Sequence, residues 1–421
     1  MWGPAVIDDS AARMQRALLR ASHLATFEQV PALVAEHAEA AGLYHARIFL
    51  ADLQEDVLRE VTGQGIDAGQ GGQKLPVEAS VPGTAFTHTR VMTTAVEGWV
   101  RHWVPVLNGT ERLGVLRVDT EHDVTRTPDL LALMEDLASL AGLLVVTKRA
   151  NSDSFARLIR SRPMTVSAEM QWTLMPPRTF ANDRVTVAAV MEPAYATAGD
   201  AYDYAVAGDI AHLAVFDAMG HDTAAGLTAT LAMATCRNHR RQGAGLPEIC
   251  EAIERTLLEQ FTHTRYTTAI LADLDLATGI LSWVNCGHHP PVLIRGGHRI
   301  TDLGCPPTHP LGTDLGLPVT VCREQLEPGD RLLLFTDGIT EARDANDREF
   351  GRDRFVDFIV RHQGDRLPVP ETLRRLIHAV LDHHDGRLND DATVLLCEWH
   401  GDIDRREDLP RTTSDTMFPS T

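Results

Sequence analysis

Lysine is almost absent from this 421-residue chain: Lys74 and Lys148 are the only two, and arginine supplies the other basic side chains. This bias is typical of GC-rich bacterial genomes. Acidic residues outnumber basic ones by 58 to 39, and the formal net charge is -19. No basic patch interrupts the acidic surplus, and nucleic-acid affinity depends largely on Lys and Arg neutralising phosphates. We therefore expect no nucleic-acid partner and a better match to divalent cations.

Long apolar segments are also missing from the sequence. No apolar run reaches the roughly eighteen residues that a membrane-spanning helix needs. The N-terminus, MWGPAVIDDS, lacks a basic segment followed by an apolar one. We expect a cytoplasmic protein that makes no membrane contact.

Cysteine pairs with a recognisable spacing are absent. The six cysteines are scattered after residue 230, with no CxxC pair and no compact disulfide spacing. We expect free thiols, mostly in the core, and a reducing compartment. The cysteines are Cys236, Cys250, Cys286, Cys305, Cys322 and Cys397.

What is present is a globular composition, with 44% hydrophobic and 23% charged residues. The chain is too long for one compact core, which favours two domains. In the first, residues 10–41 have helical spacing, and Thr26 followed by Gln29 is typical of a capping box. Strands are expected over residues 46–50, 57–62, 91–95, 99–106 and 113–118, with Asn108-Gly109 as a hairpin turn between the last two.

A second helix is expected from Leu130. Leu130, Leu133, Leu137, Leu140 and Leu144 step by three and four, which is the spacing of a two-helix coiled coil. We expect a homodimer formed through this helix.

The order helix, antiparallel strands, helix resembles a GAF domain, a fold that senses small ligands. That resemblance implies a GAF-like regulatory and dimerisation domain over residues 1–147, with a small ligand of unknown identity. The alternative is a domain that binds nothing and only dimerises, because a fold alone does not give function. A helical linker is expected over residues 148–176 and a disordered tail over 401–421.

Acidic residues in the second half recur where apolar strands end. Four such segments stand out, at residues 198–203, 216–222, 335–342 and 389–394. Strand ends of stacked sheets can bring such carboxylates to one point. Hard divalent cations prefer oxygen ligands, and a pair of them can activate water for phosphoryl displacement. Each segment alone also fits an ordinary turn.

Taken in order, the four segments read Gly-Asp-x-Tyr-Asp, Asp-x-Met-Gly-His, Thr-Asp-Gly-x-x-Glu-Ala and Asp-Asp-x-Thr-Val. This set resembles the metal-dependent serine/threonine phosphatases (PPM type), in the branch of the stage II sporulation E phosphatase. Supporting matches are Gln171 with Leu174-Met175-Pro176, Thr267-Thr268-Ala269, Asn285 to Pro291, and Phe350-Gly351. The resemblance covers about residues 165–399.

The resemblance implies an α+β architecture in which a GAF-like α/β sensor precedes a PPM-type α-β-β-α sandwich over residues 177–400. It also implies two Mn²⁺ or Mg²⁺ ions. Asp217 would bridge both ions and the carbonyl of Ala218 would help hold one, while Asp200 would serve the second. Asp337 and Asp390 would complete the first, and Asp391 is the less favoured neighbour. Catalysis is expected to depend on Asp200, Asp217, Asp337 and Asp390.

Several positions depart from the family pattern. Ala198, Ala218 and Asp222 stand where glycine is common, and we expect Asp222 to cap the following helix. His221 could act as a general acid, although a structural role is favoured. The pairs His288-His289 and His383-His384 are interpreted as loop or helix-end residues. The phosphate-holding arginine of the animal enzymes does not map onto this sequence.

The sequence thus predicts a phosphoprotein Ser/Thr phosphatase that uses metal-activated water and is regulated by the GAF-like domain. Family resemblance implies a phosphorylated anti-anti-sigma-type protein as substrate. Two alternatives stay open: a catalytically inactive signalling scaffold, and a small-molecule sensor of the same fold. Retention of every acidic position argues against the scaffold.

Overall fold

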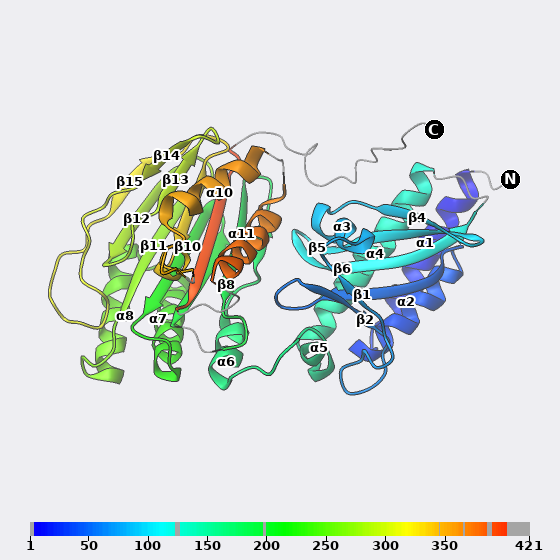
Figure 1. Ribbon diagram of the computed structural model, residues 1–421, viewed down its shortest axis with the longest axis horizontal. Coiled ribbons are helices and arrows are strands. Elements are labelled where there is room, and N and C mark those ends of the chain that lie inside the picture. Colours follow the sequence, from blue (N-terminus) through cyan, green and yellow to red (C-terminus); the bar gives the residue numbers. More distant parts are fainter. Residues whose placement is uncertain are drawn as a thin grey trace. The chain divides into compact units, whose positions relative to one another are not determined.

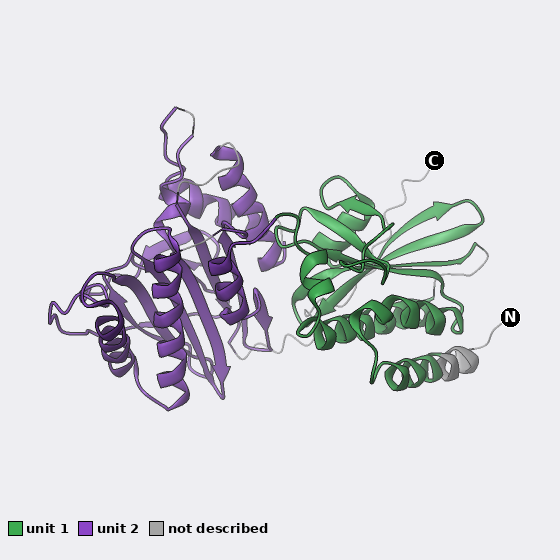
Figure 2. Cartoon of the chain, turned by 90° about the horizontal axis from the view of Figure 1, so that it is seen from below, with its two compact units in different colours: residues 1–162, 407–421 green, residues 163–406 purple. Residues whose placement is uncertain are grey.

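The computed structural model divides into two compact units (Figure 2). Unit 1 extends from the N-terminus to Arg162, and unit 2 begins at Pro163. The division falls inside the segment expected to be a linker. Most of the expected C-terminal tail lies outside the described residues, which are 4–122, 127–196, 199–344, 346–364, 367–384 and 390–401.

A six-stranded antiparallel sheet forms the centre of unit 1. Its strands are β1 (Tyr44–Ala51), β2 (Val57–Val61), β3 (Lys74–Pro76), β4 (Met92–Val96), β5 (Trp99–Asn108) and β6 (Glu111–Glu121). Their order across the sheet is β3-β2-β1-β6-β5-β4. The predicted hairpin is confirmed, since Asn108 pairs with Glu111 and Gly109 has a φ of +60°. Short β3 was not predicted.

Helices cover both faces of this sheet. They are α1 (Pro4–Ala21), the 3-10 turn η1 (Phe27–Gln29), α2 (Val30–Glu39), α3 (Val81–His88), α4 (Pro128–Arg149) and α5 (Asp153–Leu158). Helices α4 and α2 lie against one face, and α1 packs on the outer side of these two helices (Figure 2). The Thr26 capping box is confirmed, because its backbone N–H donates to Gln29 Oε1 at 3.0 Å. Helix α3, which was not predicted, packs with Phe49, Trp103 and Val115 on the other face.

The leucines of α4 face the core of their own unit. Leu133, Leu137 and Leu144 are buried, and Leu130 and Leu140 pack against the same cluster. A coiled-coil interface through this seam is therefore wrong, because the apolar stripe already packs against strand β5 and helices α1 and α2. The same spacing serves a core-facing helix equally well.

Helix α4 also bears on the membrane expectation. By length and composition alone it qualifies as a candidate membrane span, contrary to the expectation that no segment does. Half of the most apolar stretch of α4 is buried inside the structure. Core helices of folded proteins can be as long and as apolar as a membrane span.

Unit 2 contains two sheets. The first has strands β9 (Asp200–Ala207), β10 (Ile210–Ala218), β11 (Thr267–Asp275), β12 (Ile280–Cys286) and β15 (Cys322–Gln325), in the order β15-β12-β11-β10-β9. The second has β7 (Thr179–Ala181), β8 (Val185–Glu192), β13 (Val292–Arg295), β14 (Arg299–Asp302), β16 (Arg331–Phe335) and β17 (Ala392–Trp399). Its order is β14-β13-β16-β17-β8-β7.

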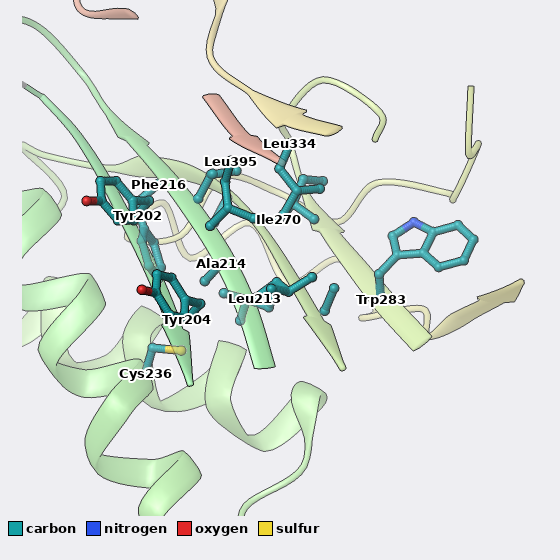
Figure 3. Close-up of a cluster of buried hydrophobic side chains, with 14 of the residues drawn as sticks. Tyr202, Tyr204, Leu213, Ala214, Phe216, Cys236, Ile270, Trp283, Leu334 and Leu395 are labelled. Carbon is teal, nitrogen blue, oxygen red and sulfur yellow. The ribbon is translucent and has the colours of Figure 1, made fainter. Parts of the chain in front are cut away.

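The two sheets are stacked between helical layers. The helices are α6 (Val166–Leu174), α7 (Thr223–Arg241), α8 (Leu246–Phe261), α9 (Asp337–Thr340), α10 (Arg352–Gly364) and α11 (Val369–His383). One core joins both sheets; it includes Leu213 and Phe216 of the first sheet, Leu334 and Leu395 of the second, and Cys236 of α7 (Figure 3). A second core lies between the β8-β17-β16 sheet and α10 and α11 (Figure 1). The predicted α-β-β-α sandwich is confirmed.

The cysteine expectation is correct for four residues and wrong for two. Cys236, Cys250, Cys286 and Cys397 are free and buried. Cys305 and Cys322 instead form a disulfide, although seventeen positions separate them. The loop after β14 returns alongside the first sheet, and this return brings the two cysteines together. Nothing in their spacing indicates it.

Candidate active site

The acidic strand ends of unit 2 meet at one place. Asp217, next to last in β10, pairs in register with Asp200, the first residue of β9. Asp337 begins α9 directly after β16, and Asp391 directly precedes β17. The two sheets are joined here by Thr336, whose Oγ1 donates to Asp200 Oδ2 at 2.6 Å.

Burial and like charge raise the pKa values of these aspartates. Burial is the largest cause at each residue. Neighbouring Asp217 and Asp391 further raise the pKa of Asp200 well above its usual value. The pKa of Asp217 rises to about 7, with contributions from Asp337, Asp390 and Asp391. Carboxylates from four segments therefore lie within electrostatic reach of one another, which is unfavourable unless cations or protons are bound.

The two adjacent aspartates before β17 differ in their surroundings. Asp390 is exposed, whereas Asp391 is 4% exposed. The backbone N–H of Gly199 donates to Asp391 Oδ2, and that of Asp391 donates to Asp390 Oδ1 at 2.9 Å. Burial and neighbouring Asp390 raise the pKa of Asp391 to about 7. Asp391, the less favoured of the pair in the sequence, thus lies deeper in the cluster.

The side chains of the cluster are not arranged with the geometry of a metal-binding site. Within the described ranges, no group of three or more His, Cys, Asp or Glu side chains is arranged to hold a metal ion. The candidate donors are nonetheless all oxygen atoms, from carboxylates and the Ala218 carbonyl, which suit Mg²⁺ and Mn²⁺. The structure brings the predicted residues together, and their assignment as ligands stays a prediction.

A tight turn connects β10 to α7. Gly199 is required here by close approach, because an added Cβ would meet the carbonyl oxygens of Gly220 at 2.3 Å and Ala218 at 2.6 Å. The N–H of Ala218 donates to Gly199 O at 3.0 Å. The Ala218 carbonyl, a predicted ligand, therefore lies at the centre of this turn. Position 198 lies outside the described residues.

The expected role of Asp222 is confirmed. Its Oδ1 accepts from the backbone N–H of Ala225 at 2.8 Å and caps α7. Its Oδ2 accepts from Arg265 at 3.0 Å, and the same guanidinium donates to Met219 O at 3.1 Å. Arg265, which was not singled out in the sequence, fixes the turn that carries Ala218. His221 is exposed and partly offsets the rise in the pKa of nearby Asp391.

A buried histidine braces the site. Burial lowers the pKa of His288 to about 4, so its ring is neutral. Its Nε2–H donates to Phe335 O at 2.9 Å, and its Nδ1 accepts from Thr268 Oγ1 at 2.6 Å. Thr268 pairs with Asp217, and Phe335 lies two residues before Asp337. His288 thus links the strands that present two of the aspartates.

This bracing role was missed in the sequence. The signal was present in Asn285-Cys286-Gly287-His288, because Asn285 exchanges two hydrogen bonds with the backbone of His288 at 2.8 and 2.9 Å. Neighbouring His289 stacks on Phe335.

Comparison with known proteins agrees with this geometry. Residues 208–400 match the family model described as Stage II sporulation protein E (SpoIIE). Phosphoserine phosphatase RsbU of Bacillus subtilis is 21% identical over 236 residues, which is 55% of this chain and 68% of RsbU. Protein IcfG of Synechocystis is 25% identical over 134 residues, 31% of this chain and 20% of IcfG. The chain therefore spans about a fifth of the length of IcfG.

Among solved structures, the catalytic domain of the serine/threonine protein phosphatase PstP in complex with two manganese ions is 20% identical. The match covers 52% of this chain and 99% of that one, with a TM-score of 0.38. On the family match and the curated relative, unit 2 is a domain of the PPM-type class of protein serine/threonine phosphatases. Within that class it belongs with the stage II sporulation E type.

Proposed function

We propose that unit 2 hydrolyses phosphoserine or phosphothreonine in a protein substrate, using two Mn²⁺ or Mg²⁺ ions. The observation that carries this proposal is the convergence of carboxylates that raise one another's pKa. Asp200, Asp217, Asp337, Asp390 and the carbonyl of Ala218 would hold the ions, and Asp391 lies beside them. When bound, the ions would activate water and offset the charge of the displaced phosphoryl group.

The protein's own groups hold this arrangement in place. Thr336 orients Asp200, His288 supports the strands carrying Asp217 and Asp337, and Arg265 fixes the turn at Ala218. These contacts restrict the carboxylates before any cation arrives, which is how supporting residues tune a metal site.

A cysteine nucleophile is disfavoured. Contact with Cys250 and burial raise the pKa of Cys286 well above its usual value. Burial raises the pKa of Cys236 and of Cys397 to about 12. A thiol acts as a nucleophile in its thiolate form, which these environments suppress. Water is therefore the proposed nucleophile, and no phosphoenzyme is expected.

For the substrate we propose a phosphorylated regulator of the anti-anti-sigma type. The relative RsbU is described as a phosphoserine phosphatase, which supports phosphoserine as the group removed. We further propose that GAF-like unit 1 regulates the reaction and that the protein is cytoplasmic. A homodimer remains part of the proposal, through a surface other than the buried α4 seam.

The competing function is a catalytically inactive scaffold of the same fold. A binding module would gain nothing from a cluster of aspartates that repel one another, two of which, Asp200 and Asp391, are buried. Their joint presence favours an enzyme. The sensor alternative places the main function in unit 1 and is distinguished by the same assay.

The test is hydrolysis of p-nitrophenyl phosphate and of a phosphoserine peptide by the full chain. We expect no activity in excess chelator, and recovery with Mn²⁺ more readily than with Ca²⁺, because Ca²⁺ prefers larger and more flexible oxygen shells. Equal activity in excess chelator would exclude the metal mechanism. No activity with any divalent cation would favour the scaffold.

A further inference from the structure

Unit 1 contains a group of charged side chains on the face of its sheet opposite α2 and α4. Arg117 and Asp119 lie on this face of β6, and Arg101 pairs in register with Asp119 from β5. On the other side Arg47 of β1 pairs with Arg117, and Glu60 of β2 lies one strand further on. Three arginines therefore accompany two carboxylates.

Both carboxylates, Asp119 and Glu60, accept hydrogen bonds from residues other than Arg117. Asp119 accepts from Arg101 Nε at 2.9 Å and Nη2 at 3.0 Å, and from His45 at 3.2 Å. Glu60 accepts from Arg47 at 2.6 Å and from the backbone N–H of Gln73 at 2.8 Å. The guanidiniums of Arg101 and Arg47 are thus neutralised by a direct partner.

Arg117 is the exception. It is 7% exposed, and within the described ranges its side chain makes no hydrogen bond and no ion pair; its Nε is buried without an acceptor. Burial and the neighbouring charges of Arg101 and Arg47 lower its pKa. A buried cation without a partner is strongly unfavourable, and such groups in proteins are almost always paired or bound to a ligand.

The surroundings of Arg117 suit a small molecule. Trp103, its register partner on β5, packs against Phe49 with ring centroids 5.6 Å apart and provides an apolar neighbour. Farther along the same face Trp99 contacts the rings of Tyr44 and His45, at 5.2 and 4.9 Å. Arg47 and Arg101 are half and one-quarter exposed, so both could turn towards an incoming anion.

We propose that Arg117 anchors a binding site for a small ligand carrying an oxyanion, either a carboxylate or a phosphate, on this face of unit 1. Arg47 and Arg101 flank the anionic group, and the aromatic side chains border it. One negative charge would balance the excess cation, and a guanidinium can donate two parallel hydrogen bonds to two oxygens of a carboxylate or a phosphate. This site is independent of the phosphatase chemistry.

The experiment uses the full chain in EDTA, titrated with sodium benzoate or inorganic phosphate against sodium chloride at equal ionic strength. Calorimetry measures binding, and thermal unfolding measures stabilisation. We expect saturable binding of at least one oxyanion, weakened by about tenfold or more in Arg117→Met, because a hydrogen bond to a charged group is lost. Binding of benzoate alone identifies a carboxylate ligand, and binding of phosphate alone identifies a phosphate ligand.

Arg112→Met is the matched control. Arg112 lies on the same strand and is equally buried, but it pairs with Glu55 and lies over the ring of Phe86. Its variant should be less stable and should keep the anion response. In chloride, Arg117→Met should be as stable as the wild type or more so, since an uncompensated charge has been removed.

Two results would overturn the proposal. One is the absence of saturable binding of either anion. The other is equal anion binding by the wild type and Arg117→Met. A marked loss of stability in Arg117→Met in chloride, together with no anion response in the wild type, would show that another part of the chain already pairs with Arg117.

Discussion

Asp217 and Asp200 face each other across the β9–β10 pair, at the end of the first sheet of unit 2. Opposed like charges on neighbouring strands are destabilising. Here burial raises both pKa values, the charge of Asp217 further raises that of Asp200, and Asp391 adds to the effect at each residue. The structure therefore maintains an arrangement that is unfavourable without bound cations, and this can be tested by removing one charge.

Asp217→Asn keeps the side-chain shape and removes that charge. We expect Mn²⁺ affinity and turnover to fall by at least about 100-fold, since even outer partners of metal ligands are worth 10–100-fold. We also expect the metal-free variant to unfold at a higher temperature than the metal-free wild type, because the repulsion with Asp200 is relieved. Phosphatase assays over a Mn²⁺ titration and thermal unfolding in EDTA measure the two effects.

Cys236→Ala is the control for that variant. Cys236 is buried in the core at α7, so the change tests a loss of packing without touching the carboxylates. Its activity per folded molecule should be close to wild type. Near-normal turnover in Asp217→Asn, or a phosphoenzyme trapped on a cysteine or serine, would contradict the two-metal proposal.

Thr336 connects the two sheets at the site and gives a second prediction. Its hydroxyl donates to Asp200 Oδ2 and accepts from the backbone N–H of Thr393 at 2.9 Å. Thr336→Val should reduce the free energy of unfolding by roughly 1–3 kcal/mol, because both buried partners lose a hydrogen bond. Mn²⁺ affinity should fall by roughly 10–100-fold. Thr336→Ser keeps the hydroxyl and should retain both properties, and equal losses in the two variants would argue against the hydrogen bonds as the cause.

The main features of the site could be predicted because each aspartate is adjacent to its strand in the sequence. Asp217 and Asp337 end apolar runs, and that position can be recognised without any tertiary contact. His288 could not be placed, because its partners lie 20 and 47 positions away and are set by strand pairing. The Cys305–Cys322 disulfide was missed for the same reason.

Local spacing was also ambiguous in unit 1. The leucines of α4 have a pattern that a dimer seam and a core-facing helix share, and only the presence of a sheet beside them decides. Among the described residues, Arg117 likewise lacks a hydrogen-bonded partner because the nearby carboxylates of Asp119 and Glu60 bond to other residues. Such competition for partners is not visible in a sequence.

The neutral state of His288 predicts a specific pH dependence. Its folded-state pKa of about 4 lies below the ordinary value of 6.5. Between these values the unfolded chain binds a proton that the folded protein does not, so the free energy of unfolding falls as the pH drops from about 6.5 to 4. A shift of this size corresponds to about 3 kcal/mol at most.

His288→Gln removes this titration while keeping an amide that can donate and accept. The site aspartates titrate in both proteins, so the difference between wild type and variant isolates His288. We expect wild-type stability to decline more steeply than that of the variant between pH 6.5 and 4, as measured by urea unfolding at several pH values. Parallel curves would show that His288 does not control acid stability.

The buried seam of α4 gives the final prediction. Leu137 is fully buried in the core of unit 1, whereas Leu143 on the same helix is 51% exposed. Leu137→Asp should reduce the free energy of unfolding of unit 1 by more than about 3 kcal/mol, because it places a charge in an apolar core. Leu143→Asp should change it by about 0.5 kcal/mol or less. Chemical unfolding and sedimentation of both variants separate loss of folding from loss of association. A Leu137→Asp protein that stays folded and only changes from dimer to monomer would restore the coiled-coil interface and contradict the packing described here.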